Sequence, residues 1–161
     1  MKINEYKVFL GENSIPYLAA TGKSVVDGRR KYDDPEKVAD ICCSAYEMHR
    51  MAEEITVMAA FDTAGHLVGL FEIGHGTIDK CILSARDIFI RALLCGAHHI
   101  ILLHNHPSGD TTPSAEDIEV TERIREAGKL MNIPLYDHII IAGGSNRLYF
   151  SFKEENIVFK A

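Results

Sequence analysis

The feature that most constrains this chain is an unbroken apolar segment that leads directly into a polar motif. Every residue from 100 to 103 is Ile or Leu, which predicts a central strand covered on both faces of its sheet. The strand ends in His104-Asn105-His106-Pro107. Because alternate strand residues point to the same face, we expect His104 and His106 side by side and Asn105 pointing away. Pro107 holds His106 in the extended region and ends the pairing.

Three helices are expected around this strand. Asp34 can cap a helix that starts at Pro35, a position where the missing N–H of proline costs nothing. Ser84 opens a second helix with the capping-box-like pattern Ser84-Ala85-Arg86-Asp87, and Ser114 opens a third. The stripe expected to face the core on the third helix consists of Val120, Ile124, Ala127 and Met131.

The other apolar segments are short, and turn residues separate them. The expected strands cover residues 55–61, 66–73, 80–83, 99–103, 135–142 and 148–152. The first two form a hairpin around Asp62-Thr63-Ala64-Gly65, and the last two flank the turn Gly143-Gly144-Ser145-Asn146. The order of strands and helices predicts an α/β fold with three layers and a mixed central sheet.

The first part of the chain differs from the rest in its pattern. Residues 1–33 are expected to be an N-terminal extension or arm, and residues 34–161 the domain itself. Within the arm, Tyr6 to Leu10 predicts a short strand. Residues 19–33 contain glycines, charges and little periodicity, which predicts a loop or an arm.

Composition limits the classes of function. The 161 residues carry a formal net charge of −6, which does not favour binding to a phosphate backbone. The one basic cluster, Arg29-Arg30-Lys31, is expected to be a solvated loop. No segment approaches the roughly 18 to 20 apolar residues of a membrane span, and the N-terminus lacks the apolar core of a signal peptide. The four cysteines have no C-x-x-C spacing. We therefore expect reduced thiols in a cytoplasmic protein.

His104, His106 and Asp117 can supply three ligands to one metal ion. Catalytic zinc sites commonly use three protein ligands and leave the fourth position to water. Two histidines on a strand end and a carboxylate in the first turn of the next helix can converge from two directions. The alternative is a pair of packing histidines beside a capping box formed by Ser114 and Asp117. Since capping and ligation are compatible at these positions, we interpret the chain as a metal-dependent hydrolase.

Such a hydrolase needs a general base, and the local candidate is Glu72. It is the one carboxylate between Gly65 and Asp79, and it lies in a largely apolar strand. Burial there would raise its pKa toward a useful value. The alternative is a glutamate at the strand edge that points to solvent.

These residues together resemble the JAMM motif of the JAB/MPN domain, in which an upstream Glu precedes H-x-H-P and then a Ser, two residues and an Asp. The matching positions here are Glu72, His104, His106, Ser114 and Asp117. The wider context is similar to the bacterial RadC-like branch over roughly residues 36–155. The segments that carry this similarity are Gly76-Thr77-Ile78-Asp79, His104-Asn105-His106-Pro107-Ser108-Gly109-Asp110, Pro113-Ser114-Ala115-Glu116-Asp117-Ile118 and Leu135-Tyr136-Asp137-His138-Ile139-Ile140-Ile141.

The resemblance implies a cytidine-deaminase-like α/β/α sandwich and a zinc site. By it, His104, His106 and Asp117 would bind Zn²⁺ with one water. Glu72 would accept the proton of this water and pass it to the leaving amine, and Ser114 would hydrogen-bond the developing oxyanion. The chain departs from the family where Ser84-Ala85-Arg86-Asp87 replaces an H/S-P-R-E run, a change that affects helix entry more than the metal.

The sequence is compatible with several functions. The leading hypothesis is a zinc metallopeptidase that cleaves a peptide or isopeptide bond in a peptide or protein substrate. The RadC-like resemblance also allows a DNA-repair-associated role or a protein-interaction module with weak or no hydrolase activity. An iron oxygenase is a fourth reading, but its carboxylate usually lies beside the first histidine. We expect Asp137-His138 to be a buried structural pair, and His75, His98 and His99 have no assigned role.

Overall fold

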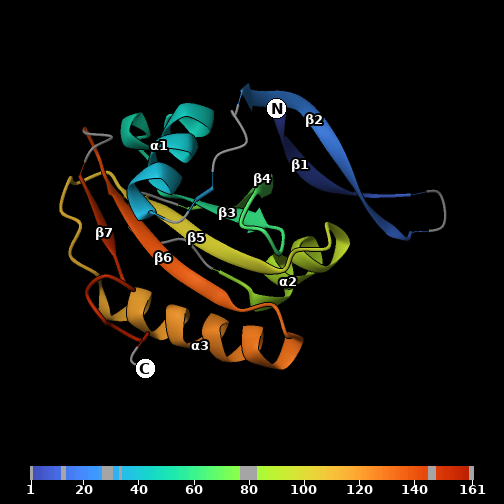
Figure 1. Ribbon diagram of the computed structural model, residues 1–161. Helices are drawn as coiled ribbons and strands as arrows, with labels where there is room; N and C mark the ends of the chain where they lie inside the picture. Colours follow the sequence, from blue (N-terminus) through green and yellow to red (C-terminus); the bar gives the residue numbers. More distant parts are fainter. Residues whose placement is uncertain are drawn as a thin grey trace.

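The computed structural model describes residues 2–11, 14–26, 31–32, 34–76, 83–144 and 148–159, and its strands join into one mixed sheet (Figure 1). The strands are β1 Lys2–Leu10, β2 Pro16–Val26, β3 Ile55–Phe61, β4 Leu67–His75, β5 His99–His106, β6 Leu135–Ala142 and β7 Tyr149–Ser151. They lie in the order β2-β1-β4-β3-β5-β6-β7. Among the strand pairs of the described residues, only β1–β4 and β5–β6 are parallel.

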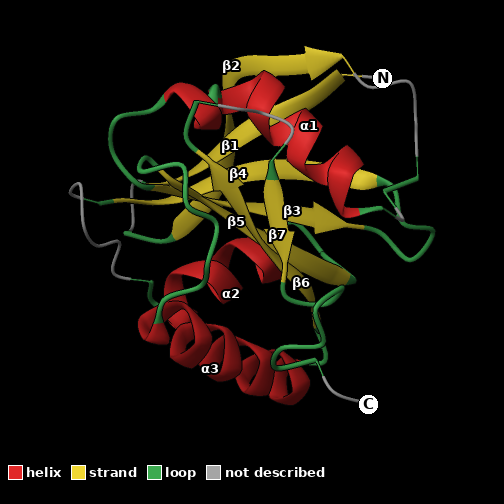
Figure 2. Cartoon of the chain, turned by 90° about the vertical axis from the view of Figure 1, so that its left-hand side faces the viewer, coloured by secondary structure: helices red, strands yellow, loops and turns green. Residues whose placement is uncertain are grey.

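Helices pack against both faces of this sheet (Figure 2). They are α1 Pro35–Tyr46, α2 Ala85–Leu94 and α3 Ala115–Met131, with a short 3-10 helix, η1 Met48–Arg50. Residues of α1 such as Val38 belong to one core cluster together with Leu103 of β5. Residues of α2 and α3 such as Ile124 belong to a second cluster together with Leu102. The mixed α/β class expected from the sequence is confirmed.

The histidine strand lies inside the sheet, as its apolar run predicts. β5 pairs antiparallel with β3 on one side and parallel with β6 on the other. All seven residues of β3 are buried, and so is every residue of β5 except His106. In β5, Leu103 faces α1, whereas Leu102 faces α2 and α3. His104 and His106 have the parity of Leu102 and therefore lie on the α3 side.

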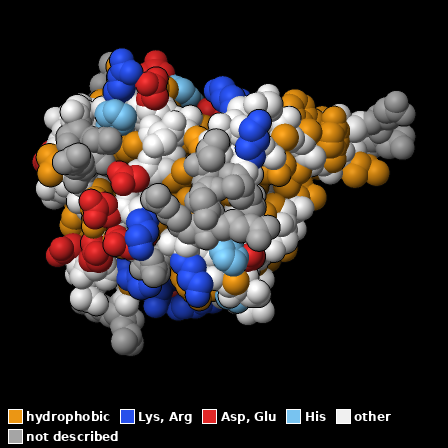
Figure 3. Space-filling model, turned by 45° about the horizontal axis from the view of Figure 1, so that its top comes forward, with side chains coloured by type: hydrophobic (Ala, Val, Ile, Leu, Met, Phe, Trp, Pro, Cys, Tyr) orange, Lys and Arg blue, Asp and Glu red, His pale blue; other side chains and the backbone are white. Residues whose placement is uncertain are grey.

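The prediction of a loop over residues 19–33 is wrong for its first part. β2 extends to Val26 and pairs with β1 from Lys2 to Leu10, which joins the sheet next to β4. The sequence of β2 hides the strand because it lies at the sheet edge and needs no apolar face. The hairpin projects from the molecule, and apolar side chains gather along it (Figure 3). Its exposed large apolar residues are Phe9, Leu10, Ile15 and Tyr17.

The buried stripe predicted for α3 is also partly wrong. Met131 is 49% exposed, and the buried residues of the helix are Thr121, Ile124 and Gly128. A β-carbon on Gly128 would lie 2.7 Å from the carbonyl oxygen of Ile133, so this helix approaches its own connection to β6 through a glycine. A threonine and a glycine therefore flank Ile124 on the inner face, and apolar periodicity cannot indicate them.

The helix starts follow the sequence with one exception. Asp34 caps α1 through the amide of Glu36 at 2.9 Å, and Ser114 caps α3 in a complete capping box. Ser84 occupies the N-cap position of α2, but its side chain makes no capping hydrogen bond, so the second capping box does not form. The expected strand at 80–83 and the tetrapeptide 143–146 fall partly outside the described residues, as does the basic cluster 29–31. Among the helices of the described residues, none is long and apolar enough to span a membrane.

Candidate metal centre

The end of β5 positions two histidines and anchors the strand beside it. His104 and His106 point toward α3, and Asn105 between them points to the opposite face, where it is fully buried. The Asn105 Oδ1 accepts the amide of Ile55 at 2.8 Å, and its Nδ2 donates to the carbonyl of Glu53 at 3.1 Å. Asn105 therefore ties the start of β3 to the histidine strand, which confirms that it points away from the site.

The loop after β5 fixes the orientation of His106. The Nδ1 of His106 donates to the carbonyl oxygen of Asp110 at 2.7 Å. Because a carbonyl can only accept, Nδ1 carries the hydrogen, and in the neutral imidazole Nε2 holds the lone pair. The amide of Gly143, directly after β6, donates to the carbonyl of His106 at 2.8 Å and closes the other side of this loop.

The first turn of α3 supplies the carboxylate. The Ser114 hydroxyl accepts the amide of Asp117 at 3.1 Å, and the amide of Ser114 donates to Asp117 Oδ2 at 2.8 Å. The same hydroxyl donates to Asp117 Oδ2 at 2.6 Å. The capping box thus holds the Asp117 side chain on the side of the helix that faces β5.

These elements bring three ligand groups together. The Nε2 atoms of His104 and His106 lie 3.0 Å apart, and they are 3.2 and 3.5 Å from the two carboxylate oxygens of Asp117. All three ligand atoms lie within 4.8 Å of one another. The side chains are 6%, 14% and 17% exposed, so the cluster is mostly shielded from solvent. Two imidazoles and one carboxylate in this arrangement could hold a metal ion.

The charges of the cluster favour a cation at its centre. Burial alone raises the pKa of Asp117, but hydrogen bonds from the two imidazoles in their protonated form and from Ser114 hold it well below the usual range of a carboxyl. The hydrogen bond to Asp117 raises the pKa of His106, although burial opposes this. An ionised carboxylate that draws positive charge onto the adjacent imidazole is an environment that a divalent ion fits, because the ion supplies that charge without a proton.

A buried chain of hydrogen bonds lies behind His104. Its Nδ1 is 2.9 Å from Nε2 of His138 in β6, and Nδ1 of His138 is 2.6 Å from the hydroxyl of Thr121 in α3. Thr121 donates in turn to the carbonyl of Asp117 at 2.5 Å. The sequence predicts His138 to be a buried structural residue, and it is fully buried, but it also contacts a ligand. Its place next to β5 depends on the β5–β6 pairing, which no local pattern indicates.

Glu72 does not lie with the cluster. Its partner across the sheet is Val57, which faces α1, so Glu72 lies on the face opposite to the two histidines. Its carboxylate contacts Nδ1 of His75 at 3.4 Å and is 27% exposed. Its charge also adds to the raised pKa of Tyr46 in α1, which burial mainly causes.

A different carboxylate, Glu54, lies beside the cluster and was not predicted. Thr56 pairs with His104, so the same register places Glu54 opposite His106 and on the same face. The charge of Glu54 contributes to the raised pKa of His106, after the larger effect of Asp117. In the sequence, Glu54 is a glutamate directly before a buried strand. Its position beside the histidines could be predicted only if the pairing of that strand with β5 were known.

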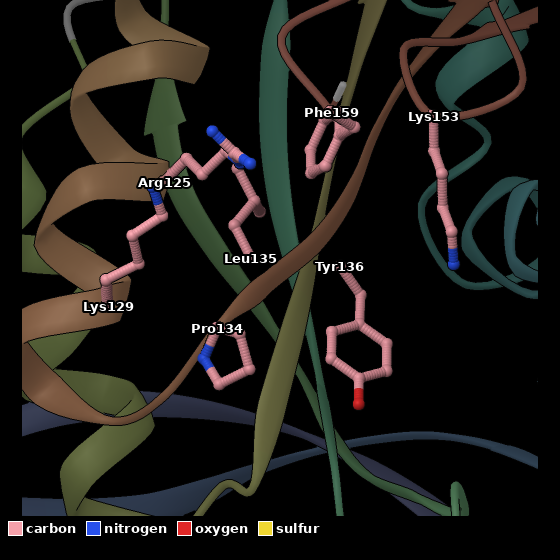
Figure 4. A pocket seen from close by; sticks show the side chains of 7 residues that line it. All are labelled: Arg125, Lys129, Pro134, Leu135, Tyr136, Lys153 and Phe159. Carbon is pink, nitrogen blue, oxygen red and sulfur yellow. The ribbon is translucent and has the colours of Figure 1, made fainter. Parts of the chain in front are cut away.

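The pocket of about 310 Å³ in Figure 4 belongs to another part of the molecule. Arg125 and Lys129 of α3 line it on one side, and Tyr136 at the start of β6 lies opposite them. The cluster instead adjoins Ala142, which pairs with His106 at the far end of β6. The length of this strand separates the two places by roughly 20 Å at about 3.3 Å per residue.

Comparisons with known proteins agree with this geometry. The RadC-like JAB domain model matches residues 32–157. A UPF0758 protein of Thermotoga maritima is 40% identical over 125 residues, which cover 78% of this chain and 54% of the relative. A UPF0758 protein of Clostridium tetani is 41% identical over 112 residues, 70% of this chain and 48% of the relative. A third, from Pelobacter propionicus, is 34% identical over 145 residues, 87% of this chain and 61% of the relative.

The chain therefore spans about half the length of the curated relatives that it matches. The family model itself covers most of this chain and includes both histidines and Asp117. The β1–β2 hairpin precedes the matched residues. The chain belongs to the RadC-like JAB domain family.

Proposed function

We propose that this chain is a zinc-dependent hydrolase of the JAMM type that cleaves a peptide or isopeptide bond. The observation that carries the proposal is the convergence of His104, His106 and Asp117, whose ligand atoms lie within 4.8 Å of one another. Imidazole nitrogens with a carboxylate oxygen are a ligand set that suits zinc. When bound, zinc lowers the pKa of a water to about 7 and polarises a carbonyl group.

The chain's own residues would supply the acid–base chemistry. We propose Glu54 as the group that accepts a proton from the attacking water and passes it to the leaving amine, because it shares a face with His106. Glu72, the candidate from the sequence, would need to reach the cluster from the opposite face of the sheet. Ser114 would donate to the developing oxyanion, for which its hydroxyl must turn away from Asp117.

The proposal extends to the architecture. A seven-stranded mixed sheet with α1 on one face and α2 and α3 on the other is consistent with a JAB/MPN domain. We propose that it is the three-layer α/β/α sandwich of that domain, related to the cytidine-deaminase fold. The DNA-associated alternative finds no support in the net charge of −6. The scaffold alternative is not favoured because the whole ligand set is present.

The test combines metal content with turnover. The native chain, Asp117→Ala and the control Glu116→Ala are analysed for zinc after purification and assayed on fluorogenic peptides and an isopeptide-linked lysine conjugate. Glu116 lies in the same helical turn but points to solvent. We expect about one zinc per chain and cleavage in the native protein and the control, with both lost in Asp117→Ala. A native protein that binds no zinc, even after incubation with it, would overturn the proposal.

A further inference from the structure

His138 is a fully buried histidine that contacts a proposed metal ligand and is not itself one. It lies in β6, and its register partner in β5 is Leu102, so its side chain faces α3 as His104 does. Its ring stacks on Phe152 with centroids 5.1 Å apart and planes 12° apart, which holds the ring plane. Both ring nitrogens have polar partners within hydrogen-bond distance, His104 on one side and Thr121 on the other.

Four groups are joined by hydrogen bonds in series: His104, His138, Thr121 and the carbonyl of Asp117. The direction of each bond follows from the last group. The carbonyl oxygen of Asp117 can only accept, so the Thr121 hydroxyl donates to it and uses its one hydrogen there. Thr121 must then accept from Nδ1 of His138, so that Nε2 of His138, in the neutral ring, has no hydrogen. This Nε2 therefore accepts from Nδ1 of His104. His104 is left with a lone pair on Nε2.

That lone pair points to the centre of the cluster. Nε2 of His104 lies 3.0 Å from Nε2 of His106 and 3.2 Å from Asp117 Oδ1. His106 has the same arrangement, because the carbonyl of Asp110 accepts from its Nδ1. The series of hydrogen bonds that starts at His104 ends on the backbone of Asp117. It therefore connects two of the three proposed ligands, His104 and Asp117, through residues of β6 and α3.

We propose that His138, oriented by Thr121, is a positioning residue that fixes His104 in the Nδ1–H tautomer, so that its Nε2 is ready to bind a metal ion. This rests on the proposed function only in the identity of the ion. The chain of donors ends at a carbonyl, which cannot pass a proton on, so it orients His104 and carries no proton to or from the site. Partners of this kind commonly raise metal affinity by about ten- to a hundredfold.

The first test observes the tautomers directly in the metal-free protein. Long-range ¹H–¹⁵N correlation spectra of histidine-labelled protein distinguish hydrogens on Nδ1 and Nε2. We expect Nδ1–H tautomers for both His104 and His138 at a pH where both rings are neutral. An Nε2–H tautomer for His104 would overturn the proposal, whether or not the protein hydrolyses any substrate.

The second test measures zinc affinity by competition with a chelator. His138→Phe keeps a ring against Phe152 but removes the acceptor of His104, and we expect zinc to bind about ten- to a hundredfold more weakly. Thr121→Val should weaken binding in the same direction, whereas Thr121→Ser keeps the hydroxyl and should restore it. Ser151→Ala removes a buried hydroxyl that bonds to Asp137 instead of this chain, and it controls for general destabilisation.

The outcomes separate this proposal from the hydrolase proposal. If His138→Phe and Thr121→Val bind zinc as tightly as the native chain, the positioning role is wrong. If zinc binds as expected but no peptide or isopeptide is cleaved, the hydrolase proposal fails and the positioning role stands. If His138→Phe does not fold, the comparison of Thr121→Val with Thr121→Ser still decides.

Discussion

A β-carbon on Gly143 would lie 2.5 Å from the carbonyl oxygen of Pro107, closer than any real β-carbon contact. Gly143 follows β6, and Pro107 follows the last histidine of β5. The two strand ends therefore approach each other so closely that only glycine fits. This contact lies at the base of the loop whose Asp110 carbonyl accepts from His106.

Gly143→Ala should consequently displace that loop and weaken zinc binding. Since the substitution moves the partner that fixes the His106 tautomer, we expect the dissociation constant for zinc to rise by about tenfold or more. Chelator competition measures this. Gly144→Ala is the matched control: it strains a residue with a φ of 80° but meets no atom within 4 Å. A Gly143→Ala variant that binds zinc as tightly as Gly144→Ala would show that the contact with Pro107 does not govern zinc binding.

The two candidate general bases can be told apart by substitution. Glu54→Gln should lower kcat by about a hundredfold or more and leave zinc content unchanged, because it removes a proton acceptor beside His106 without removing a ligand. Glu72→Gln should retain activity within a few fold, since Glu72 lies on the other face of the sheet. Steady-state kinetics on one cleaved peptide makes the comparison. The reverse pattern would return the role to Glu72.

Asn105 is expected to matter for both stability and catalysis. Asn105→Ala leaves the buried amide of Ile55 and the carbonyl of Glu53 without their partner, which should cost about 1–3 kcal/mol in the free energy of unfolding. It also frees the backbone on both sides of Glu54. Urea denaturation gives the stability, and the kinetics should show a fall in kcat.

Asn105→Asp should be less stable than Asn105→Ala at neutral pH. It keeps the oxygen that accepts from Ile55, but it turns a carboxylate oxygen toward the carbonyl of Glu53 and places a charge at a fully buried position. A free energy of unfolding equal to that of the native chain at pH 7 would contradict this expectation.

His99 should make the protein less stable in mild acid. Its pKa is lowered from 6.5 to about 4, mainly by burial and also by the charge of His98, whereas Asp62 opposes the shift. Between these values the unfolded chain binds a proton that the folded chain does not. Stability contributed by the neutral ring is therefore present above pH 6.5 and is lost as the pH falls toward 4. The upper limit of the loss is about 3 kcal/mol, at about 1.4 kcal/mol for each pKa unit.

His99→Phe should flatten this pH dependence. The ring of His99 stacks between Phe61 and Tyr136, with centroid distances of 5.0 and 3.9 Å, and phenylalanine can occupy the same place. Thermal unfolding at pH 8 and pH 5 gives the comparison, and the native chain should lose more stability than the variant. Parallel losses in the two proteins would assign the acid sensitivity to other groups.

The sequence predicts those parts of the fold that have strong local patterns. The strands at 55–61 and 135–142 have the predicted bounds because each contains a run of apolar residues and ends at a turn. The convergence of His104, His106 and Asp117 could also be predicted, since these residues lie on consecutive elements. In each of these cases a short stretch of sequence is sufficient for the prediction.

What could not be predicted depends on pairing between distant strands. Glu54 lies beside His106 only because β3 and β5 are antiparallel in one particular register, and a shift by one residue would turn it to the other face. His138 reaches His104 only through the parallel pairing of β5 with β6. The edge strand β2 and the inner face of α3 were missed because polar and small residues replace the apolar pattern there.

The capping box that holds Asp117 also joins the integrity of α3 to the state of the cluster. Ser114 and Asp117 are at once the start of the longest helix in the described residues and the edge of the candidate metal site. An ion bound between β5 and this first turn would link the two elements on either side of the intervening loop. Fraying of the helix start would release the ion, and loss of the ion would in turn leave the helix start held by its cap alone. Removal of the ion by a chelator should therefore unfold the N-terminal turn of α3 while the sheet stays folded.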